Sequence, residues 1–424
     1  MLELARIRKE KETIIERLKL RNFDGKELIE NILVLDGNWR ESKQELEKIA
    51  AESNQLAKSI GSLFKEGKQD EANKAKARAG ELKELEKNAK EAMNAYAEKL
   101  QAALYEVPNV PNPSVPAGNS DEDNEVLSNS GTIPTKLDFW QPHWELAKKY
   151  DIIDFEVGVK VTGAGFPFYK GQGARLQRAL INFFLDQARD NGYTEIIPPF
   201  VVNEASGIGT GQLPDKEGQM YHATIDDLYL IPTAEIPLTN MYRNELVKST
   251  DLPIKLTGYT PCFRREAGSY GSDVRGLNRL HQFDKVELVR IEHPDNSYAV
   301  LDEMVKYVQD ILTKLELPYR TLRLCGGDLG FTSALTFDLE VYSAAQDKWL
   351  EVSSVSNFET FQANRLKLRF KDENNNKQLV HTLNGSALAL PRILAALLEN
   401  NQTEEGIKIP AALVPYTGFD IIKN

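Results

Sequence analysis

The chain has 424 residues, of which 41% are hydrophobic, enough for a large core and at least one further module. Its formal net charge of −11 argues against an indiscriminate nucleic-acid binder, so any RNA must meet a local basic surface. No run of about 18 apolar residues occurs, and we therefore expect no membrane span.

The amino terminus and the cysteines bear on the cellular compartment. Residues 1–19 are amphipathic but mix Glu with Lys and Arg and lack the apolar core of a secretion signal, which indicates a helix of the mature protein. Cys262 and Cys325 are too few for a disulfide framework and lack zinc-ligand spacing. We therefore expect a cytoplasmic protein without structural zinc.

Two segments near the amino terminus have the four-three alternation of a coiled coil. From Leu28 to Leu63, nine of eleven seam positions are apolar, and the alternation resumes from Ala72 to Ala103. A short polar stretch separates them. This pattern predicts an antiparallel helical hairpin that projects roughly 50 Å at about 1.5 Å per residue.

The tip of this hairpin is basic. Residues 58–78 hold six basic side chains against three acidic ones, among them the lysines Lys65, Lys68, Lys74 and Lys76. A basic tip on an acidic protein indicates a contact with RNA. Charged residues on coiled coils also serve solubility, and such hairpins also act as scaffolds or dimerisation arms, so the pattern leaves both interpretations open.

A change of composition follows the hairpin. Four prolines between residues 108 and 116 favour extended geometry and precede an acidic run, which indicates a domain boundary. We place a helical domain at residues 1–106, a Pro-rich and acidic linker at 107–136, and a third domain at 137–424. In the third domain, β-rich segments alternate with helices such as 174–190 and 295–315, which predicts an α+β domain on an antiparallel sheet.

Two proline-containing segments punctuate this domain. In GYTEIIPPF, Pro198 and Pro199 cannot donate to a β-ladder, so the strand ends at or lies along a sheet edge. In IPTAEIPLTN, Thr233 and Glu235 alternate onto one face. A hydroxyl and a carboxylate suit an ammonium group, and a surface turn is the alternative interpretation.

The segment 260–287 predicts two strands that each present chemistry on one face. Alternation places Arg264 beside Glu266, and Phe283 beside Glu287 on the returning strand. A cation, two carboxylates and an aromatic ring then share one surface, which suits a phosphate-bearing substrate with a planar base. An ordinary solvated ion pair is the alternative for the Arg-x-Glu pattern.

The connection between these strands, residues 267–279, carries Gly268, Gly271 and Gly276 together with Arg275 and Arg279. Connections of this length are usually functional or disordered, and its arginines favour a phosphate contact.

A further cation stands near the end of the chain. Pro391 is best tolerated in the first turn of a helix, which places Arg392 at the amino end of the helix through Leu398. The helix dipole disfavours a cation there, and an anionic ligand would offset that cost. A triphosphate contact explains the arrangement better than structure alone.

Together these segments resemble the class II aminoacyl-tRNA synthetases, and in particular the bacterial-type seryl-tRNA synthetase family. The resemblance covers nearly the whole chain. It is carried by VPNVPNPSVP, KVTGAGFPFYKGQGARLQRALINF, GYTEIIPPF, IPTAEIPLTN, FRREAGS, RGLNRLHQFDKVEL, EVSSVSNFETFQANR and HTLNGSALALPRILAALLEN. One departure is that Pro391 precedes Arg392 where the class often has Gly, which we interpret as a subtype difference.

The resemblance implies a homodimeric serine–tRNA ligase that activates L-serine with ATP to seryl-adenylate and transfers serine to tRNA(Ser), and also to tRNA(Sec). It implies that GYTEIIPPF builds the dimer interface. It also implies that the helical arm grips the long variable arm of the tRNA by its shape and backbone.

The resemblance also assigns site residues. Those for serine are Thr233, Ala234, Glu235, Glu287 and Ser386. Those for ATP are Arg264, Arg265, Glu266, Arg279, Leu280, Phe283, Glu351, Val352, Ser353, Ser354 and Arg392, of which Arg264 and Arg392 act on the reaction.

Glu351 and Ser354 match positions that hold Mg²⁺ with the ATP phosphates in the family. Hard oxygen ligands suit this ion. A spacing of three puts side chains on opposite faces of a regular strand, so a shared metal requires a bulge or a strand end near Ser353.

Two other functions stay open at this point. An amino-acid:carrier-protein ligase would use the same adenylation site without tRNA, and the intact helical arm argues against it. A non-catalytic coiled-coil scaffold would have no use for Arg264, Glu266 and Arg392.

Overall fold

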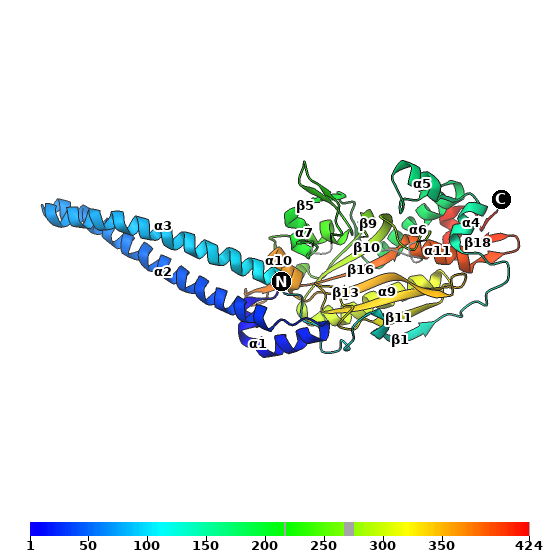
Figure 1. The fold of residues 1–424 in the computed structure, drawn as a ribbon, viewed down its shortest axis with the longest axis horizontal. Helices are drawn as coiled ribbons and strands as arrows, with labels where there is room; N and C mark the ends of the chain where they lie inside the picture. Colours follow the sequence, from blue (N-terminus) through cyan, green and yellow to red (C-terminus); the bar gives the residue numbers. More distant parts are fainter. Residues whose placement is uncertain (216–217, 267–274, 424) are drawn as a thin grey trace. The chain divides into compact units, whose positions relative to one another are not determined.

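The computed structural model describes residues 1–215, 218–266 and 275–423. The chain divides into two compact units (Figure 1). One unit comprises Leu2–Lys19 and Phe23–Pro108, and the other comprises Met1, Leu20–Asn22 and the chain from Asn109 onward.

The first unit is helical. It contains α1 (Leu4–Leu18), α2 (Lys26–Lys65) and α3 (Gln69–Glu106). Helices α2 and α3 run side by side as a hairpin (Figure 1), and each seam position predicted from the alternation is buried or half-buried. The sequence therefore predicted the helical hairpin correctly, because a heptad pattern is complete within two neighbouring helices.

The second unit is built on an eight-stranded sheet. The strand order is β1 (Glu125–Ser130), β11 (Tyr319–Arg323), β12 (Leu335–Ser343), β13 (Lys348–Asn357), β16 (His381–Ala389), β10 (Gln282–Glu292), β9 (Ile254–Phe263) and β4 (Thr194–Glu195). Neighbouring strands pair antiparallel except β4, which runs parallel to β9. Strand β4 lies at the edge of the sheet, as GYTEIIPPF predicted.

Three helices pack on this sheet and form the main core with it. They are α6 (Gly171–Asp190), α9 (Ser297–Lys314) and α11 (Leu390–Asn400). Phe184, Leu301 and Leu394 are fully buried in this core. The domain is thus α+β with an antiparallel sheet, as expected. Helix α11 is buried along most of its length, which fits its nearly continuous run of apolar residues.

Smaller elements surround the sheet. The helices are α4 (His143–Lys149), α5 (Phe155–Val161), α7 (Glu204–Thr210), α8 (Glu235–Asn240), α10 (Phe361–Leu366) and α12 (Val414–Thr417). The short strands are β2 (Ile153–Asp154), β3 (Phe168–Tyr169), β5 (Val201–Asn203), β6 (His222–Ala223), β7 (Leu228–Leu230), β8 (Leu246–Lys248), β14 (Arg369–Lys371), β15 (Lys377–Leu379), β17 (Gln402–Thr403), β18 (Gly406–Lys408) and β19 (Ile421–Ile422). Among the helices of the described residues, none has the length and apolarity needed to cross a membrane.

The segment 107–136, predicted as a Pro-rich and acidic linker, contains regular structure. Its residues 125–130 form strand β1, which pairs with β11 at the edge of the main sheet, and Val107, Val110 and Val115 are buried. The prolines prevent regular pairing only up to residue 116, and the EVLSNS stretch beyond them can donate to a ladder. The domain limits that we placed from composition stay a prediction.

Candidate active site

Strand β10 forms the axis of the candidate site. Phe283, Lys285 and Glu287 alternate onto one of its faces, while Val286 and Leu288 point into the main core. At roughly 3.3 Å per residue, Phe283 and Glu287 stand about 13 Å apart along the strand. The aromatic ring and the carboxylate predicted from the sequence therefore share one surface.

Glu287 lies at one end of this face and is fully buried. Its carboxylate accepts hydrogen bonds from Thr233 Oγ1 at 3.0 Å and from Asn384 Nδ2 at 3.2 Å. Lys285 forms an ion pair with it and donates to Thr233 Oγ1 at 2.9 Å. A buried charge persists when it is paired and hydrogen-bonded, so this cluster holds a carboxylate in place beneath the surface.

Glu235 supplies a second buried carboxylate. It accepts from Gln362 Nε2 at 2.6 Å and from Gln212 Nε2 at 3.3 Å. Burial raises the pKa of Glu235 to about 7, and the negative charge of Glu287 adds to the shift. Two carboxylates thus flank Thr233, which suits a cationic group of a ligand.

The predicted strand alternation of Thr233 and Glu235 is wrong. They do not alternate along a strand, because α8 begins at Glu235 and the N–H of Glu235 donates to Thr233 Oγ1 at 3.2 Å. Pro237 cannot supply a ladder donor and is tolerated in the first turn of a helix. Ala234, between them, is fully buried.

Ser386 lies where the sequence placed it, beside Glu287. The two residues are cross-strand partners on β16 and β10, so their side chains share one face of the sheet. Ser353 Oγ on β13 donates to the Ser386 carbonyl at 2.6 Å and fixes this stretch of β16.

Arg264 and Phe283 meet at the other end of the face. The N–H of Arg264 donates to the carbonyl of His281 at 2.9 Å, and its guanidinium lies 5.2 Å from the centre of the Phe283 ring. A guanidinium over an aromatic face is an attractive arrangement. The structure thus brings together two side chains that are 19 positions apart in the sequence.

The predicted alternation of Arg264 and Glu266 is wrong. Strand β9 ends at Phe263, and Glu266 has a left-handed backbone with φ of 49°. The reason is that the ladder with β10 ends where Phe263 pairs with Gln282, so strand periodicity no longer applies. Glu266 instead accepts from Arg279 Nη1 at 2.8 Å.

Two further residues that were predicted to bind ATP lie near this point. Arg265 is exposed and its N–H donates to the Gln219 carbonyl at 2.8 Å, while the Leu280 side chain is buried. Gly268 and Gly271, predicted to shape the connection, lie outside the described residues.

Strand β13 carries the predicted metal residues and does contain a bulge. Leu339 pairs with Ser353 and Glu340 with Glu351, so Val352 has no partner on β12. The extra residue brings Glu351 and Ser354 onto the same face, as a shared ligand requires. Val352 and Ser353 are buried, whereas nearly half of the Glu351 side chain is exposed.

Arg392 lies in the first turn of α11, as Pro391 predicted. Its Nε donates to the Asn278 carbonyl at 3.0 Å, and its Nη1 donates to the Glu351 carbonyl at 2.8 Å and lies 3.4 Å from the Glu351 carboxylate. The chain thus holds this cation between the end of the β9–β10 connection and strand β13.

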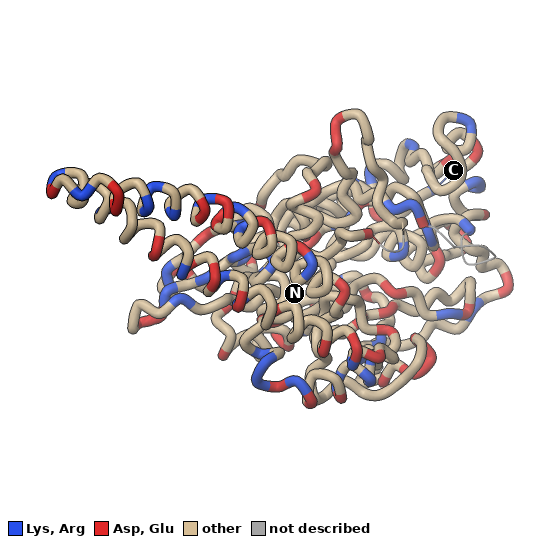
Figure 2. Tube along the Cα trace, turned by 60° about the vertical axis from the view of Figure 1, so that its left-hand side comes forward, with Lys and Arg blue, Asp and Glu red and all other residues tan. Residues whose placement is uncertain are grey.

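The four tip lysines belong to the helical unit. Lys65 ends α2, Lys68 precedes α3, and Lys74 and Lys76 lie on its first turns, all of them exposed. Figure 2 shows basic and acidic residues interspersed along the hairpin. Lys68 pairs with Glu66 at 2.9 Å.

Comparison with known proteins assigns the family. The model for the seryl-tRNA synthetase N-terminal domain matches residues 1–111, and that for the tRNA synthetase class II core domain (G, H, P, S and T) matches residues 221–401. A serine–tRNA ligase of Salinibacter ruber is 52% identical over 99% of this chain and 98% of that protein. The chain belongs to the seryl-tRNA synthetase family.

Structures of the family agree with this assignment. The crystal structure of seryl-tRNA synthetase from Pyrococcus horikoshii complexed with ATP matches with a TM-score of 0.92 and 33% identity, over 100% of this chain and 99% of that chain. The cytoplasmic enzyme of Naegleria fowleri in complex with AMP matches with a TM-score of 0.87 and 26% identity, over 100% and 99%. This seryl-tRNA synthetase family member is thus a class II aminoacyl-tRNA synthetase, a serine–tRNA ligase.

Sequence reasoning missed three residues at the site of this synthetase. Lys285 and Asn384 each precede a predicted site residue by two positions on a strand, so alternation could have found both. Gln362 on α10 gave no local signal, because it meets Glu235 only through the tertiary fold.

Proposed function

We propose that this serine–tRNA ligase forms seryl-adenylate from L-serine and ATP on the face of strand β10, and then transfers serine to tRNA(Ser) and also to tRNA(Sec). One observation carries the first step. Phe283, with Arg264 over its ring, and the buried Glu287 stand at the two ends of one strand face. An adenylate laid along this face would meet its base at one end and its amino acid at the other.

At the serine end, Glu235 and Thr233 would receive the ammonium group, with Ala234 forming the wall between them. Glu287, paired with Lys285, would accept the hydrogen bond of the serine hydroxyl, beside Ser386. A site built around a buried acceptor discriminates strongly against an amino acid that lacks the hydroxyl.

At the nucleotide end, Phe283 would stack on adenine and Glu266 would accept from its amino group, with Leu280 and Arg265 lining the pocket. Arg279 and Arg392 would hold the outer phosphates. In the reaction, an oxygen of the serine carboxylate attacks the α-phosphorus and pyrophosphate leaves. Arg264 would neutralise the charge that develops at phosphorus. Because the substrate carboxylate is the nucleophile, no side chain has to act as one.

The residues around the β13 bulge fit Mg²⁺. Asp338 is the cross-strand partner of Ser354, and its Oδ1 is buried without a hydrogen-bond partner among the described residues. Burial and the nearby Glu351 raise the pKa of Asp338 well above its usual range, which marks a site short of positive charge. Glu351 and Ser354 would hold the ion, which would neutralise phosphate charge when bound.

For tRNA, we propose that residues 1–106 form the binding arm, residues 107–136 connect it, and residues 137–424 form the catalytic domain. The exposure of Lys65, Lys68, Lys74 and Lys76 supports contact with the phosphate backbone. The family resemblance supports both tRNA(Ser) and tRNA(Sec).

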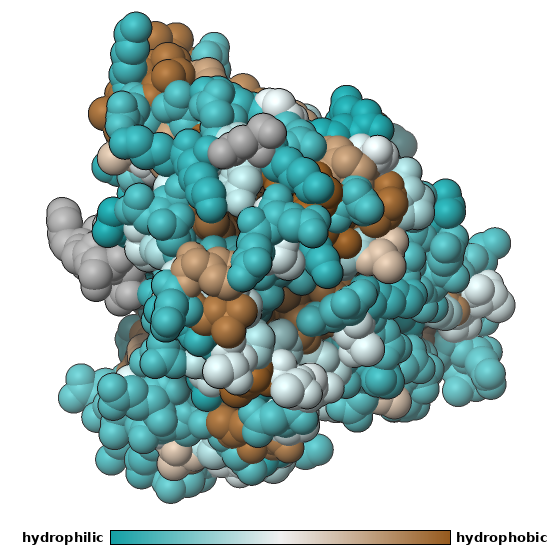
Figure 3. Space-filling model, turned by 90° about the vertical axis from the view of Figure 1, so that its right-hand side faces the viewer, coloured by the Kyte–Doolittle hydropathy of each residue, from teal (hydrophilic) through white to brown (hydrophobic). Residues whose placement is uncertain are grey.

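We also propose a homodimer in the cytoplasm. The side chains of Ile197 and Phe200, which follow the edge strand β4, are 84% and 40% exposed. Neighbouring large apolar side chains that are exposed in this way often mark a protein–protein interface. Figure 3 shows apolar patches among hydrophilic residues on one face of the molecule. The two buried free cysteines support a reducing compartment.

Serine-dependent ATP–pyrophosphate exchange tests the adenylation step, and serine charging of tRNA tests the transfer. Exchange together with acyl transfer to a carrier protein, and none to tRNA, would favour the carrier-protein ligase. The absence of serine-dependent exchange would overturn the proposed mechanism and favour the scaffold.

A further inference from the structure

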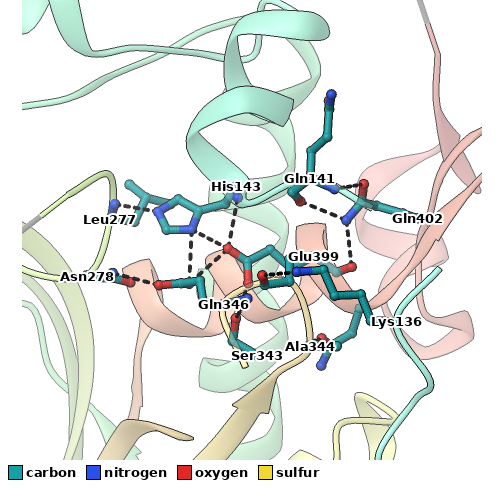
Figure 4. Close-up of polar contacts among 12 residues, drawn as sticks. Lys136, Gln141, His143, Leu277, Asn278, Ser343, Ala344, Gln346, Glu399 and Gln402 are labelled. Atoms are coloured by element: carbon teal, nitrogen blue, oxygen red, sulfur yellow. Dashed lines mark hydrogen bonds and ion pairs between the residues drawn. The ribbon is translucent and has the colours of Figure 1, made fainter. Parts of the chain in front are cut away.

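A buried polar network joins helices α4 and α11 to Leu277 and Asn278 (Figure 4). His143 on α4 and Glu399 on α11 have no exposed surface. Glu399 Oε1 accepts from the backbone N–H of His143 at 2.8 Å, from its ring Nδ1 at 2.6 Å and from Gln346 Nε2 at 2.9 Å. Ser343 donates to the other oxygen. Four donors on two oxygens suit a carboxylate.

This network fixes the proton position on His143. The backbone N–H of Leu277 donates to His143 Nε2 at 2.7 Å, so Nε2 carries no proton and Nδ1–H faces Glu399. Glu399 holds ring atom Nδ1 and Leu277 holds ring atom Nε2, so the ring is fixed on both sides. Glu399 also accepts from the backbone N–H of His143, which fixes the residue that carries the ring. A carboxylate in this place is a common means of orienting a histidine ring.

The bond to Leu277 anchors the returning end of the β9–β10 connection. The neighbouring Gly276 has φ of 67°, and a Cβ there would stand 2.2 Å from His143 Nε2. A residue with a side chain therefore does not fit between the connection and the ring. Arg275 lies 4.7 Å from the Trp144 ring centre and 3.3 Å from Glu145, which adds two exposed contacts with α4.

The next residue links the network to Arg392. Asn278 Nδ2 donates to Gln346 Oε1 at 2.9 Å, so Gln346 bridges Asn278 and Glu399. The carbonyl of Asn278 accepts from Arg392 Nε at 3.0 Å. The direction of the Arg392 guanidinium thus depends on a backbone segment that His143 and Gln346 hold.

We propose that His143 and Glu399 are positioning residues for nucleotide binding, which hold residues 275–279 so that the Asn278 carbonyl orients Arg392. This inference rests on the proposed contact of Arg392 with the ATP phosphates. It predicts a selective defect, because the hydrogen bonds of the serine residues Thr233, Glu235 and Glu287 go to a different set of partners.

The test measures KM for ATP and for serine in pyrophosphate exchange with Glu399→Gln and His143→Phe. We expect KM for ATP to rise about tenfold, because the weakened hydrogen bond orients a charged group. We expect KM for serine to stay within about twofold of the wild-type value. A merely structural role would lower the active fraction, and so kcat, with both KM values unchanged. That result, or an equal rise in both KM values, would overturn the proposal.

Gln402→Ala is the matched control. Gln402 Nε2 donates to the Glu399 carbonyl at 2.9 Å and the side chain also bonds to Gln141, on the side of α11 away from Leu277 and Asn278 (Figure 4). The loss of these hydrogen bonds should leave KM for ATP unchanged. A rise equal to that of His143→Phe would show that any loosening near α11 suffices, which contradicts the proposal.

A second variant keeps the test decisive if His143→Phe does not fold. Gly276→Ala displaces the connection without removing a buried group, and we expect the same selective rise in KM for ATP. Direct ATP binding by calorimetry without serine separates the two proposals. One outcome would contradict the proposed reaction but support the positioning role. In that outcome, the wild-type protein binds ATP more tightly than the variants but shows no serine-dependent exchange.

Discussion

At the scale of single residues, the pair Arg264 and Phe283 supports one prediction for the nucleotide end. Arg264→Ala should lower serine-dependent exchange by about 10²–10³, because it removes a charge-stabilising donor near the reacting phosphorus. Pyrophosphate exchange measures the effect, with circular dichroism as the check on folding.

Arg320→Ala is a fitting control for this prediction. Arg320 also lies over an aromatic ring, 4.9 Å from the centre of the Trp349 ring on β13, but outside the site. Its loss should leave exchange near the wild-type rate. An Arg264→Ala enzyme as active as this control would contradict the role assigned to Arg264.

The buried Glu287 supports a second prediction, on amino-acid selectivity. Glu287→Gln keeps the size of the side chain but removes the ion pair with Lys285, and it should narrow the preference for serine over alanine by at least about tenfold. Exchange measured with each amino acid gives the ratio. Glu292→Gln, on the same strand and also buried beside an arginine, should keep the original ratio. An unchanged ratio in Glu287→Gln would show that another group reads the hydroxyl.

The raised pKa of Glu235, about 7, predicts a pH dependence. Below this value the carboxyl is protonated and no longer attracts an ammonium group, so kcat/KM for serine should fall about tenfold per unit as pH drops below 7. Glu235→Gln should show a lower value with this break removed. A wild-type profile that stays flat from pH 7 to pH 5 would rule out the ionised Glu235 as the ammonium partner.

At the scale of elements, the edge strand β4 and the exposed residues after it predict the dimer. Ile197→Asp should raise the dimer dissociation constant by about 100-fold or more, because a two-fold interface buries the new charge twice. Sedimentation velocity measures it. Val34→Asp, which also replaces an exposed apolar residue but on α2, should leave the dimer intact. Equal effects of both variants would argue against this interface.

The β13 bulge was anticipated only through the family resemblance, which assigned Glu351 and Ser354 to one Mg²⁺ ion. In a regular strand, residues three positions apart, such as Glu351 and Ser354, face opposite sides. Only their assignment to the same metal ion required a bulge between them. The structure places it at Val352, one residue from the expected Ser353.

At the scale of the whole molecule, the helical hairpin and the candidate active site belong to different units. Replacing residues 28–103 with a short linker should leave serine-dependent exchange nearly unchanged and greatly weaken tRNA charging, since the hairpin buries its seam within itself. If the protein without the hairpin charged tRNA as efficiently as the wild type, the hairpin would not bind tRNA and its interpretation as a scaffold would be favoured.

The tip lysines give a milder version of this test. Changing Lys65, Lys68, Lys74 and Lys76 to Gln should flatten the salt dependence of tRNA binding, by roughly 0.7–0.9 in slope for each lost phosphate contact. The same charge change at Lys306, Lys314, Lys371 and Lys377, all exposed on the other unit, is the control. Equal slopes in the two variants would show that net charge, and no contact at the tip, governs binding.

Local patterns in the sequence were enough to predict some of the elements. The heptad seam of the hairpin, the first turn of α11 at Pro391 and the proline-limited edge at β4 each follow from a few neighbouring residues. The sequence also predicted which kinds of side chain share the site, because strand alternation placed the aromatic Phe283 and the carboxylate Glu287 on one face.

The partners of these site residues depend on how distant elements pack together. The register of β10 against β16 set Ser386 opposite Glu287, and the packing of α4 against α11 joined His143 to Glu399, 256 positions away. No local pattern encodes such contacts, because they arise when elements distant in sequence pack around one core. The burial of the Glu235 carboxylate has the same origin, since its hydrogen bond to Gln362 forms only across the fold.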